Sequence, residues 1–124
     1  MTIKEVSEKF GISQDTLRYY ERVGMIPTVT RTSSGIRNYQ EQDLFWVDTA
    51  VCMRNAGLST EVVAEYVRLY LEGEQTIMAR LKLLEDHREQ LLDQQKQLEE
   101  MLELLNSKIR TYEDAIRTGK LSHE

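Results

Sequence analysis

The fold is decided by residues 16–27, which read Thr16-Leu17-Arg18-Tyr19-Tyr20-Glu21-Arg22-Val23-Gly24-Met25-Ile26-Pro27. The first part has helical spacing, and Gly24 and Pro27 end the helix. Apolar side chains three residues apart are expected to share its buried face: Leu17, Tyr20 and Val23. The exposed flanks carry Arg18, Tyr19 and Arg22. A helix that packs on one side and presents basic and aromatic groups on the other suits contact with phosphate.

A short helix is predicted just before this stretch. Residues 2–5 read Thr-Ile-Lys-Glu, which is a capping box, and Gly11 suits a C-cap. An apolar stripe follows the cap: Ile3, Val6 and Phe10. Ser13 can cap the next helix. Two short helices joined by a tight turn with glycine predict a helix-turn-helix.

The segment after Pro27 favours a small β-hairpin. Residues 28–31 and 36–39 have strand character, and Thr32-Ser33-Ser34-Gly35 between them is a turn. The second arm carries another arginine and tyrosine, Arg37 and Tyr39. Together the two segments indicate a recognition helix followed by a wing.

Two further helices are expected, at 41–56 and 59–71. The inward positions of the first and of the turn after it are Leu44, Val47, Val51 and Leu58. Those of the second are Val62, Val63, Tyr66, Val67 and Tyr70. Residues 72–76 are predicted to be a hinge. The first domain therefore spans residues 1–71.

From residue 77 to 118 apolar residues alternate four and three apart, which predicts a coiled-coil dimerisation helix. Forty residues would span about 60 Å. The apolar seam positions are Ile77, Leu81, Leu84, Leu91, Leu98, Leu102, Leu105, Ile109, Tyr112 and Ile116. A lone amphipathic surface helix is the alternative, but so long a helix has too little globular domain to cover its seam. Residues 119–124 form a tail.

Two polar seam residues, Arg88 and Gln95, indicate the direction of pairing. In a parallel homodimer Arg88 would face its own copy, a like-charge pair in a partly desolvated seam. In an antiparallel homodimer it lies against Leu105, where the arginine stem can pack while its head reaches solvent. We therefore expect an antiparallel coiled coil. This reasoning applies to a homodimer only, because in a heterodimer Arg88 would not face its own copy.

Composition and charge limit the function classes. The 124 residues allow one compact domain plus an extended element, with no apolar run that could span a membrane and no signal peptide. A single cysteine fits a reducing cytoplasm. The net charge of −5 divides into +2 for residues 1–40 and −7 for the remainder, so the basic excess lies where the nucleic-acid surface is expected.

Enzymatic and metal-binding functions are not indicated. No phosphate loop or nucleophile motif is present, and the single cysteine and two separated histidines, His87 and His123, give no metal-ligand spacing. We therefore expect neither an enzyme nor a cofactor.

The helix-turn-helix and wing motifs of residues 2–71 resemble the MerR family of bacterial transcription regulators, and residues 77–118 resemble the family by architecture. The resemblance implies a mainly α fold with four helices and a hairpin wing, joined to an antiparallel coiled coil. It implies a homodimer that binds a near-palindromic operator in double-stranded DNA. The dimer would activate transcription by RNA polymerase through bending and untwisting the promoter.

Positions that match the family motif are expected to contact DNA. Arg18 and Tyr19 resemble the family's DNA-contacting pair, with Tyr20 as its packed neighbour. Thr16 and Gln14 would lie nearest the base edges. The remaining expected contacts are the basic and wing residues Arg22, Arg31, Arg37 and Tyr39, with Gly35 in the turn of the wing. The cysteines of metal-sensing relatives are absent, and a drug-binding domain is not expected.

Cys52 lies on the helix predicted at 41–56. Spacing favours a small buried hydrophobe, because none of its helical neighbours supplies a positive charge that would stabilise a thiolate. Its Cys-Met-Arg-Asn-Ala-Gly setting nevertheless resembles the short aldehyde-responsive MerR-like subfamily, which implies a sensor alkylated by formaldehyde or methylglyoxal. A charge for the thiolate could come from Arg54, Arg68 or Arg80, or from the coil of the other subunit.

Two other functions stay open. The chain could be an effector-independent repressor or architectural DNA-binding protein, in which Cys52 is structural. It could also be a coiled-coil adaptor that uses the first domain for protein contacts. A salt titration of DNA binding distinguishes the adaptor hypothesis from the two DNA-binding hypotheses. Induction by aldehyde distinguishes a sensor from an effector-independent DNA-binding protein.

Overall fold

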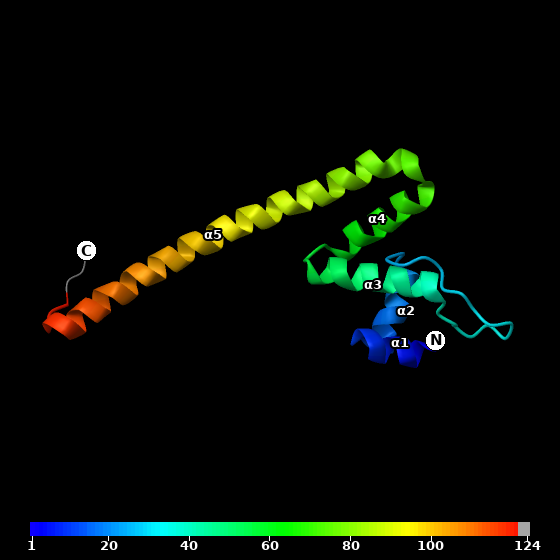
Figure 1. The fold of residues 1–124 in the computed structure, drawn as a ribbon, viewed down its shortest axis with the longest axis horizontal. Helices are drawn as coiled ribbons and strands as arrows, with labels where there is room; N and C mark the ends of the chain where they lie inside the picture. The colour runs from blue at the N-terminus through cyan, green and yellow to red at the C-terminus, as the bar shows by residue number, and fades with distance from the viewer. Residues whose placement is uncertain (122–124) are drawn as a thin grey trace. The chain divides into compact units, whose positions relative to one another are not determined.

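The computed structural model describes residues 1–121, and within them the regular elements are all helical (Figure 1). They follow in the order α1 (Ile3–Phe10), α2 (Gln14–Arg22), α3 (Glu41–Asn55), α4 (Thr60–Glu72), the 3₁₀ turn η1 (Glu74–Thr76) and α5 (Ile77–Thr118). The chain divides into two compact units, Met1–Leu84 and Glu85–Glu124. The mainly α fold predicted from the sequence is confirmed.

Side-chain caps define the helix-turn-helix. Thr2 and Glu5 form the predicted capping box of α1, and Gly11 ends that helix in the left-handed region at φ 68°. The Thr16 amide donates to Ser13 Oγ at 3.0 Å, which caps α2. Both helices therefore begin where the sequence places their caps, and the first also ends there, whereas α2 ends at Arg22, before Gly24.

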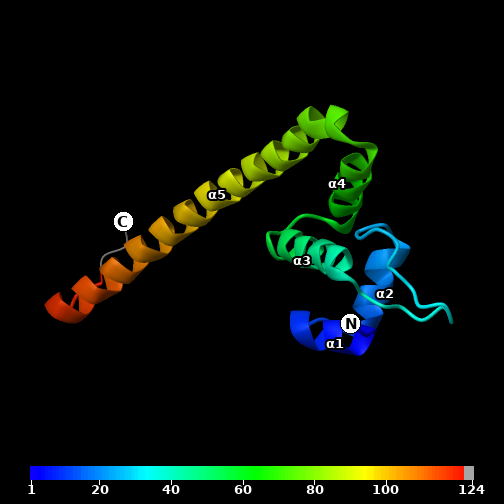
Figure 2. The same ribbon diagram turned by 45° about the vertical axis from the view of Figure 1, so that its right-hand side comes forward.

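The core of the first unit joins α1 to α2 and α3, and α3 to α4 (Figures 1 and 2). Its fully buried side chains include Val6, Leu17, Met25, Val47, Ala50 and Val63. Two predicted inward positions are wrong. Val23 is exposed because α2 has already ended at Arg22. Tyr70 is exposed although its ring lies edge-on against Trp46, and Leu69 takes the buried position beside it.

The predicted hairpin strands are not formed. Residues 28–39, which we call the wing loop, contain one isolated antiparallel bridge between Arg31 and Arg37 in the described chain. The Thr30 amide, which would continue the ladder to Asn38, donates to Asp43 instead. The neighbouring Val29 amide points away from the second arm and donates to Glu21. The wing loop therefore depends on side chains for its position, a loss of ladder bonds that the sequence did not indicate.

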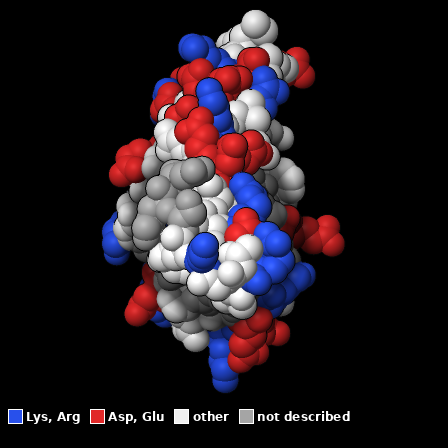
Figure 3. Space-filling view, turned by 90° about the vertical axis from the view of Figure 1, so that its left-hand side faces the viewer, with Lys and Arg blue, Asp and Glu red and all other residues white. Residues whose placement is uncertain are grey.

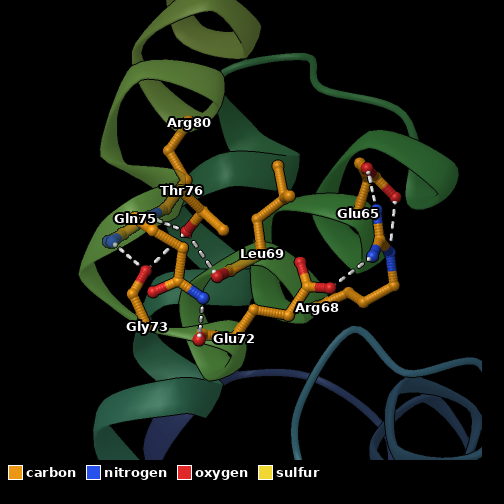
Figure 4. A network of polar contacts seen from close by, with 8 residues as sticks. All are labelled: Glu65, Arg68, Leu69, Glu72, Gly73, Gln75, Thr76 and Arg80. Carbon is orange, nitrogen blue, oxygen red and sulfur yellow. Dashed lines mark hydrogen bonds and ion pairs between the residues drawn. The ribbon is translucent and has the colours of Figure 1, made fainter.

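The segment predicted as a hinge is a hydrogen-bonded corner between α4 and α5 (Figure 4). The Thr76 hydroxyl lies 2.6 Å from the Leu69 carbonyl oxygen and 2.7 Å from that of Gly73, and shares its proton between them. Arg80 donates to Thr76 Oγ1 at 3.1 Å and to the Gly73 carbonyl at 3.2 Å, and its guanidinium lies 4.9 Å from the Tyr70 ring centre. Thr76 is buried, so the hydrogen bonds that stabilise this corner are shielded from water.

Helix α5 is continuous over 42 residues and has no buried side chain among them. The apolar seam positions predicted from the heptads are exposed, including Leu81, Leu91, Leu98, Leu102 and Leu105. An apolar row of this length along one helix is a surface that a protein covers with a partner.

Replacing Thr76 with valine tests the corner. Thr76→Val keeps the shape but removes the hydroxyl, and we expect the free energy of unfolding to fall by about 1–2 kcal/mol. The measurement is chemical denaturation followed by circular dichroism. Thr111→Val is the matched control, because Thr111 Oγ1 only donates to a carbonyl of its own helix, and it should change stability by less than about 0.5 kcal/mol. Equal stabilities of the two variants would contradict the assignment.

Candidate nucleic-acid interface

The outer side of α2 presents polar groups from its first turns. Arg18 is 43% exposed in its side chain and pairs with Asp15 at 2.9 Å, and its second amino group lies 3.5 Å from Gln14 Oε1. The Ser13 and Thr16 hydroxyls are 2.8 Å apart, so Thr16 belongs to the cap of the helix. Such exposed ion pairs are weak and exchange readily for phosphate.

The second cation of α2 is held by an aromatic ring. The Arg22 guanidinium carbon lies 5.3 Å from the centre of the Tyr19 ring, and Tyr19 is half-buried. This stacking keeps the guanidinium extended along the surface without neutralising its charge. Arg18 and Arg22 therefore lie one turn apart on the exposed side of one short helix.

The tip of the wing loop is closed by local bonds. The Thr32 amide donates to the Ile36 carbonyl at 2.8 Å, and Gly35 has φ 87°, a conformation that favours glycine. Arg31 donates from Nη1 to the Gly35 carbonyl at 2.8 Å and is exposed. Its remaining donors are available to an outside acceptor such as phosphate.

Arg37 has a different environment from the other expected DNA contacts. Its Nε donates to Glu21 Oε1 at 2.8 Å, and the side chains of this pair are only 23% and 11% exposed. The other carboxylate oxygen of Glu21 accepts the Val29 amide at 3.0 Å. The sequence reasoning missed Glu21, because its partners Val29 and Arg37 lie eight and sixteen residues away and no local pattern indicates them.

Tyr39 lies in the core, so the prediction that it contacts phosphate is wrong. It is 1% exposed, and its buried hydroxyl has no hydrogen-bond partner among the described residues. Burial raises the pKa of this phenol, and the Arg37 charge opposes that rise. The backbone of Tyr39 is fixed by two hydrogen bonds to the first residue. Its amide donates to the Met1 carbonyl, and its carbonyl accepts from the Met1 ammonium.

Asp43 is a second missed residue. It is a buried acid at the third position of α3, and its Oδ2 accepts the Gln40 amide at 2.8 Å and the Thr30 amide at 3.4 Å. The Gln40 and Asp43 spacing is a capping-box pattern that could have been found in the sequence. Asp43 ties the wing loop to α3 as Glu21 ties it to α2.

On the face shown in Figure 3, Lys and Arg side chains are interspersed with Asp and Glu. The exposed arginines of α2 and the wing loop are Arg18, Arg22 and Arg31.

Cys52 is exposed on α3, contrary to the expectation of a buried hydrophobe. Its thiol donates to Asp48 Oδ1 at 4.0 Å. The arginines considered as its charge partners are bonded elsewhere. Arg54 donates to the Leu58 carbonyl at 2.6 Å, while Arg68 pairs with Glu65 and Glu72 and Arg80 bonds the corner (Figure 4).

Neither a metal site nor a membrane span is found in the part of the chain that is described. Residues 1–121 contain no cluster of histidine, cysteine and acidic side chains suited to a metal ion. None of their helices is long and apolar enough to cross a bilayer.

Comparison with known sequences identifies clear relatives. Residues 1–69 match the profile described as MerR HTH family regulatory protein. The HTH-type transcriptional regulator AdhR of Bacillus subtilis is 50% identical over 75% of this chain, which spans just under two thirds (66%) of that relative. An HTH-type transcriptional regulator of Haemophilus influenzae is 32% identical over 97% of this chain and 89% of its own length.

Solved structures agree with these matches. A MerR family transcriptional regulator from Listeria monocytogenes superposes with a TM-score of 0.84 at 42% identity, covering 96% of this chain and 90% of its own. HiNmlR, described as a MerR family regulator lacking the sensor domain and bound to promoter DNA, gives a TM-score of 0.75 at 32% identity, covering 97% and 95%.

The orphan hydroxyl of Tyr39 gives a direct test of its placement. Tyr39→Phe removes a buried polar atom without changing the ring, and we expect the free energy of unfolding to rise by about 1 kcal/mol. Thermal unfolding measures the change. Tyr70→Phe is the control, because Tyr70 is 41% exposed and keeps its ring contacts, and it should leave stability nearly unchanged. Loss of stability in Tyr39→Phe would show that the hydroxyl has a partner.

Proposed function

The chain belongs to the MerR family of helix-turn-helix transcriptional regulators, and from this premise we propose that two copies bind one promoter duplex and activate transcription by distorting it. The observation that carries the proposal is the orientation of α2. Leu17 and Tyr20 are buried behind it, so its polar side, with Gln14, Thr16 and Arg18, is free to enter a major groove. HiNmlR, which was solved on promoter DNA, supports the same role for this chain.

The proposed contacts divide by chemistry. Gln14 and Thr16, at the N-terminal end of α2, reach base edges and specify sequence. The residues proposed to hold the phosphate backbone and set the register are Arg18, Tyr19, Arg22 and Arg31. Because few groups read bases, we propose that deformability of the promoter contributes to sequence preference.

Dimerisation is proposed from the uncovered row along α5. A second copy of α5 would bury the apolar seam, and antiparallel pairing would place Arg88 against leucine instead of against its own copy. Two recognition helices related by a two-fold axis match a near-palindromic operator. The distorted promoter would then be used by RNA polymerase, in the cytoplasm where the DNA lies.

Thiol-based sensing is the finer part of the proposal. A Cys52 thiolate adds to the carbonyl carbon of an aldehyde such as formaldehyde, a carbon–sulfur bond forms, and the carbonyl oxygen takes up a proton to give a hemithioacetal. Exposure of the thiol supports this role, as does the resemblance of residues 52–57 to the aldehyde-responsive subfamily. The alternative is an effector-independent DNA-binding protein in which Cys52 has no chemical role.

DNA binding is tested by salt titration of a single cation variant. Arg18→Gln should weaken binding to a duplex carrying the chain's own upstream region about tenfold, and lower the slope of log K against log salt by about 1. Fluorescence anisotropy gives both quantities. Lys96→Gln on α5 makes the same charge change at a residue outside the proposed DNA contacts and should leave the slope unaltered. If wild-type protein ignores the duplex at low ionic strength, the function is not DNA binding.

The sensor role is tested by Cys52→Ala in a promoter assay. Formaldehyde should raise transcription with the wild-type protein but leave the Cys52→Ala protein at its basal level, with DNA affinity unchanged in the absence of aldehyde. Mass spectrometry of the treated wild type should place the added mass on residue 52. Induction that survives in Cys52→Ala would favour the effector-independent alternative.

A further inference from the structure

Glu21 has contacts that neither a base-reading nor a phosphate-binding role explains. It lies near the end of α2, yet its carboxylate is turned inward and only 11% exposed. One oxygen accepts the Val29 amide at 3.0 Å and the other accepts Arg37 Nε at 2.8 Å. These two partners stand on opposite arms of the wing loop, so one side chain of α2 contacts both.

The wing loop has little internal support. Its described backbone has the single Arg31–Arg37 bridge, with cross-arm bonds from Thr32 to Ile36 and from Asn38 to Thr30. A two-stranded unit this short does not hold a fixed orientation by itself. Its orientation therefore depends on what anchors its arms. The end of the second arm is fixed by the buried Tyr39 and its backbone bonds to Met1, whereas the first arm is bonded by Glu21 from α2 and Asp43 from α3, and Glu21 also reaches the second arm through Arg37.

The Glu21–Arg37 pair is suited to that task. Because both side chains are largely withdrawn from water, the ion pair is screened less than an exposed pair such as Arg18–Asp15. The carboxylate also accepts a backbone amide that has no ladder partner, so losing it leaves that amide and the guanidinium unpaired.

We infer that Glu21 is a positioning residue for DNA binding, whose carboxylate fixes the wing loop against the recognition helix, with Arg37 as its counter-ion instead of a phosphate contact. The inference rests on the proposed function. It adds to that function a residue that sets the spacing between the two DNA-contacting elements.

Charge repulsion alone predicts that removing Glu21 would strengthen DNA binding. A carboxylate on a helix that faces DNA repels phosphate, so neutralising it should strengthen binding if it only contributes charge. If Glu21 positions the wing loop, neutralising it should weaken binding. The sign of the change therefore separates the two roles.

The test measures DNA affinity over a salt series for Glu21→Gln, Arg37→Gln and the double variant. We expect each single variant to bind about tenfold more weakly, with the slope of log K against log salt unchanged, because no phosphate contact is lost. The double variant should bind no more weakly than the singles, since both remove one anchor. Asp15→Asn, a matched neutralisation on the same helix, should bind as tightly as wild type or more tightly.

Three results would overturn the inference while the proposed function stands. These are Glu21→Gln binding as tightly as wild type or more tightly, Arg37→Gln lowering the slope by about 1, and single losses that add in the double variant. Should Glu21→Gln unfold, Arg37→Lys carries the test, because it keeps the charge but loses the Nε donor and should weaken binding at unchanged slope. Wild-type protein that binds no duplex would instead refute the proposed function itself.

Discussion

Burial of Leu17 and Tyr20 is the constraint on which the rest of the structure depends. Helix α2 has nine residues, too few to be stable alone, so it exists because this apolar side is packed against the core. The same burial fixes the rotation of the helix about its axis. Arg18 is exposed as a consequence, and the chemistry of the outer surface follows from the packing of the inner one.

The wing loop depends on the same helix in a different way. Its arms share a short set of backbone bonds, and the first arm gives its Val29 and Thr30 amides to Glu21 and Asp43. Side chains from α2 and α3 therefore add to the burial of Tyr39 in fixing the loop. Because two of these contacts come from charged residues, we expect the position of the loop to be sensitive to their substitution.

The sequence predicted local features well and long-range pairs poorly. Capping at Thr2 and Ser13 follows from contacts within a few residues, and the structure confirms it. The helices predicted at 41–56, 59–71 and 77–118 are found at Glu41–Asn55, Thr60–Glu72 and Ile77–Thr118. The Glu21–Arg37 pair joins residues sixteen apart, and no local pattern encodes it. Strand propensity at 28–31 was overridden because tertiary partners took the backbone donors.

In the proposed sensor, Cys52 is connected to the recognition helix α2 through two residues, Arg54 and Tyr20. Arg54 follows it on the last turn of α3, donates to the Leu58 carbonyl, and lies close enough to Tyr20 for its charge to lower a phenol pKa that burial raises. An adduct that moves the end of α3 would therefore act on the buried side of α2 through Tyr20. Since interiors are close-packed, a small displacement there would change the orientation of α2 and not only its surroundings. In the proposed sensor, the exposed thiol of Cys52 would thus affect DNA binding through the core residue Tyr20.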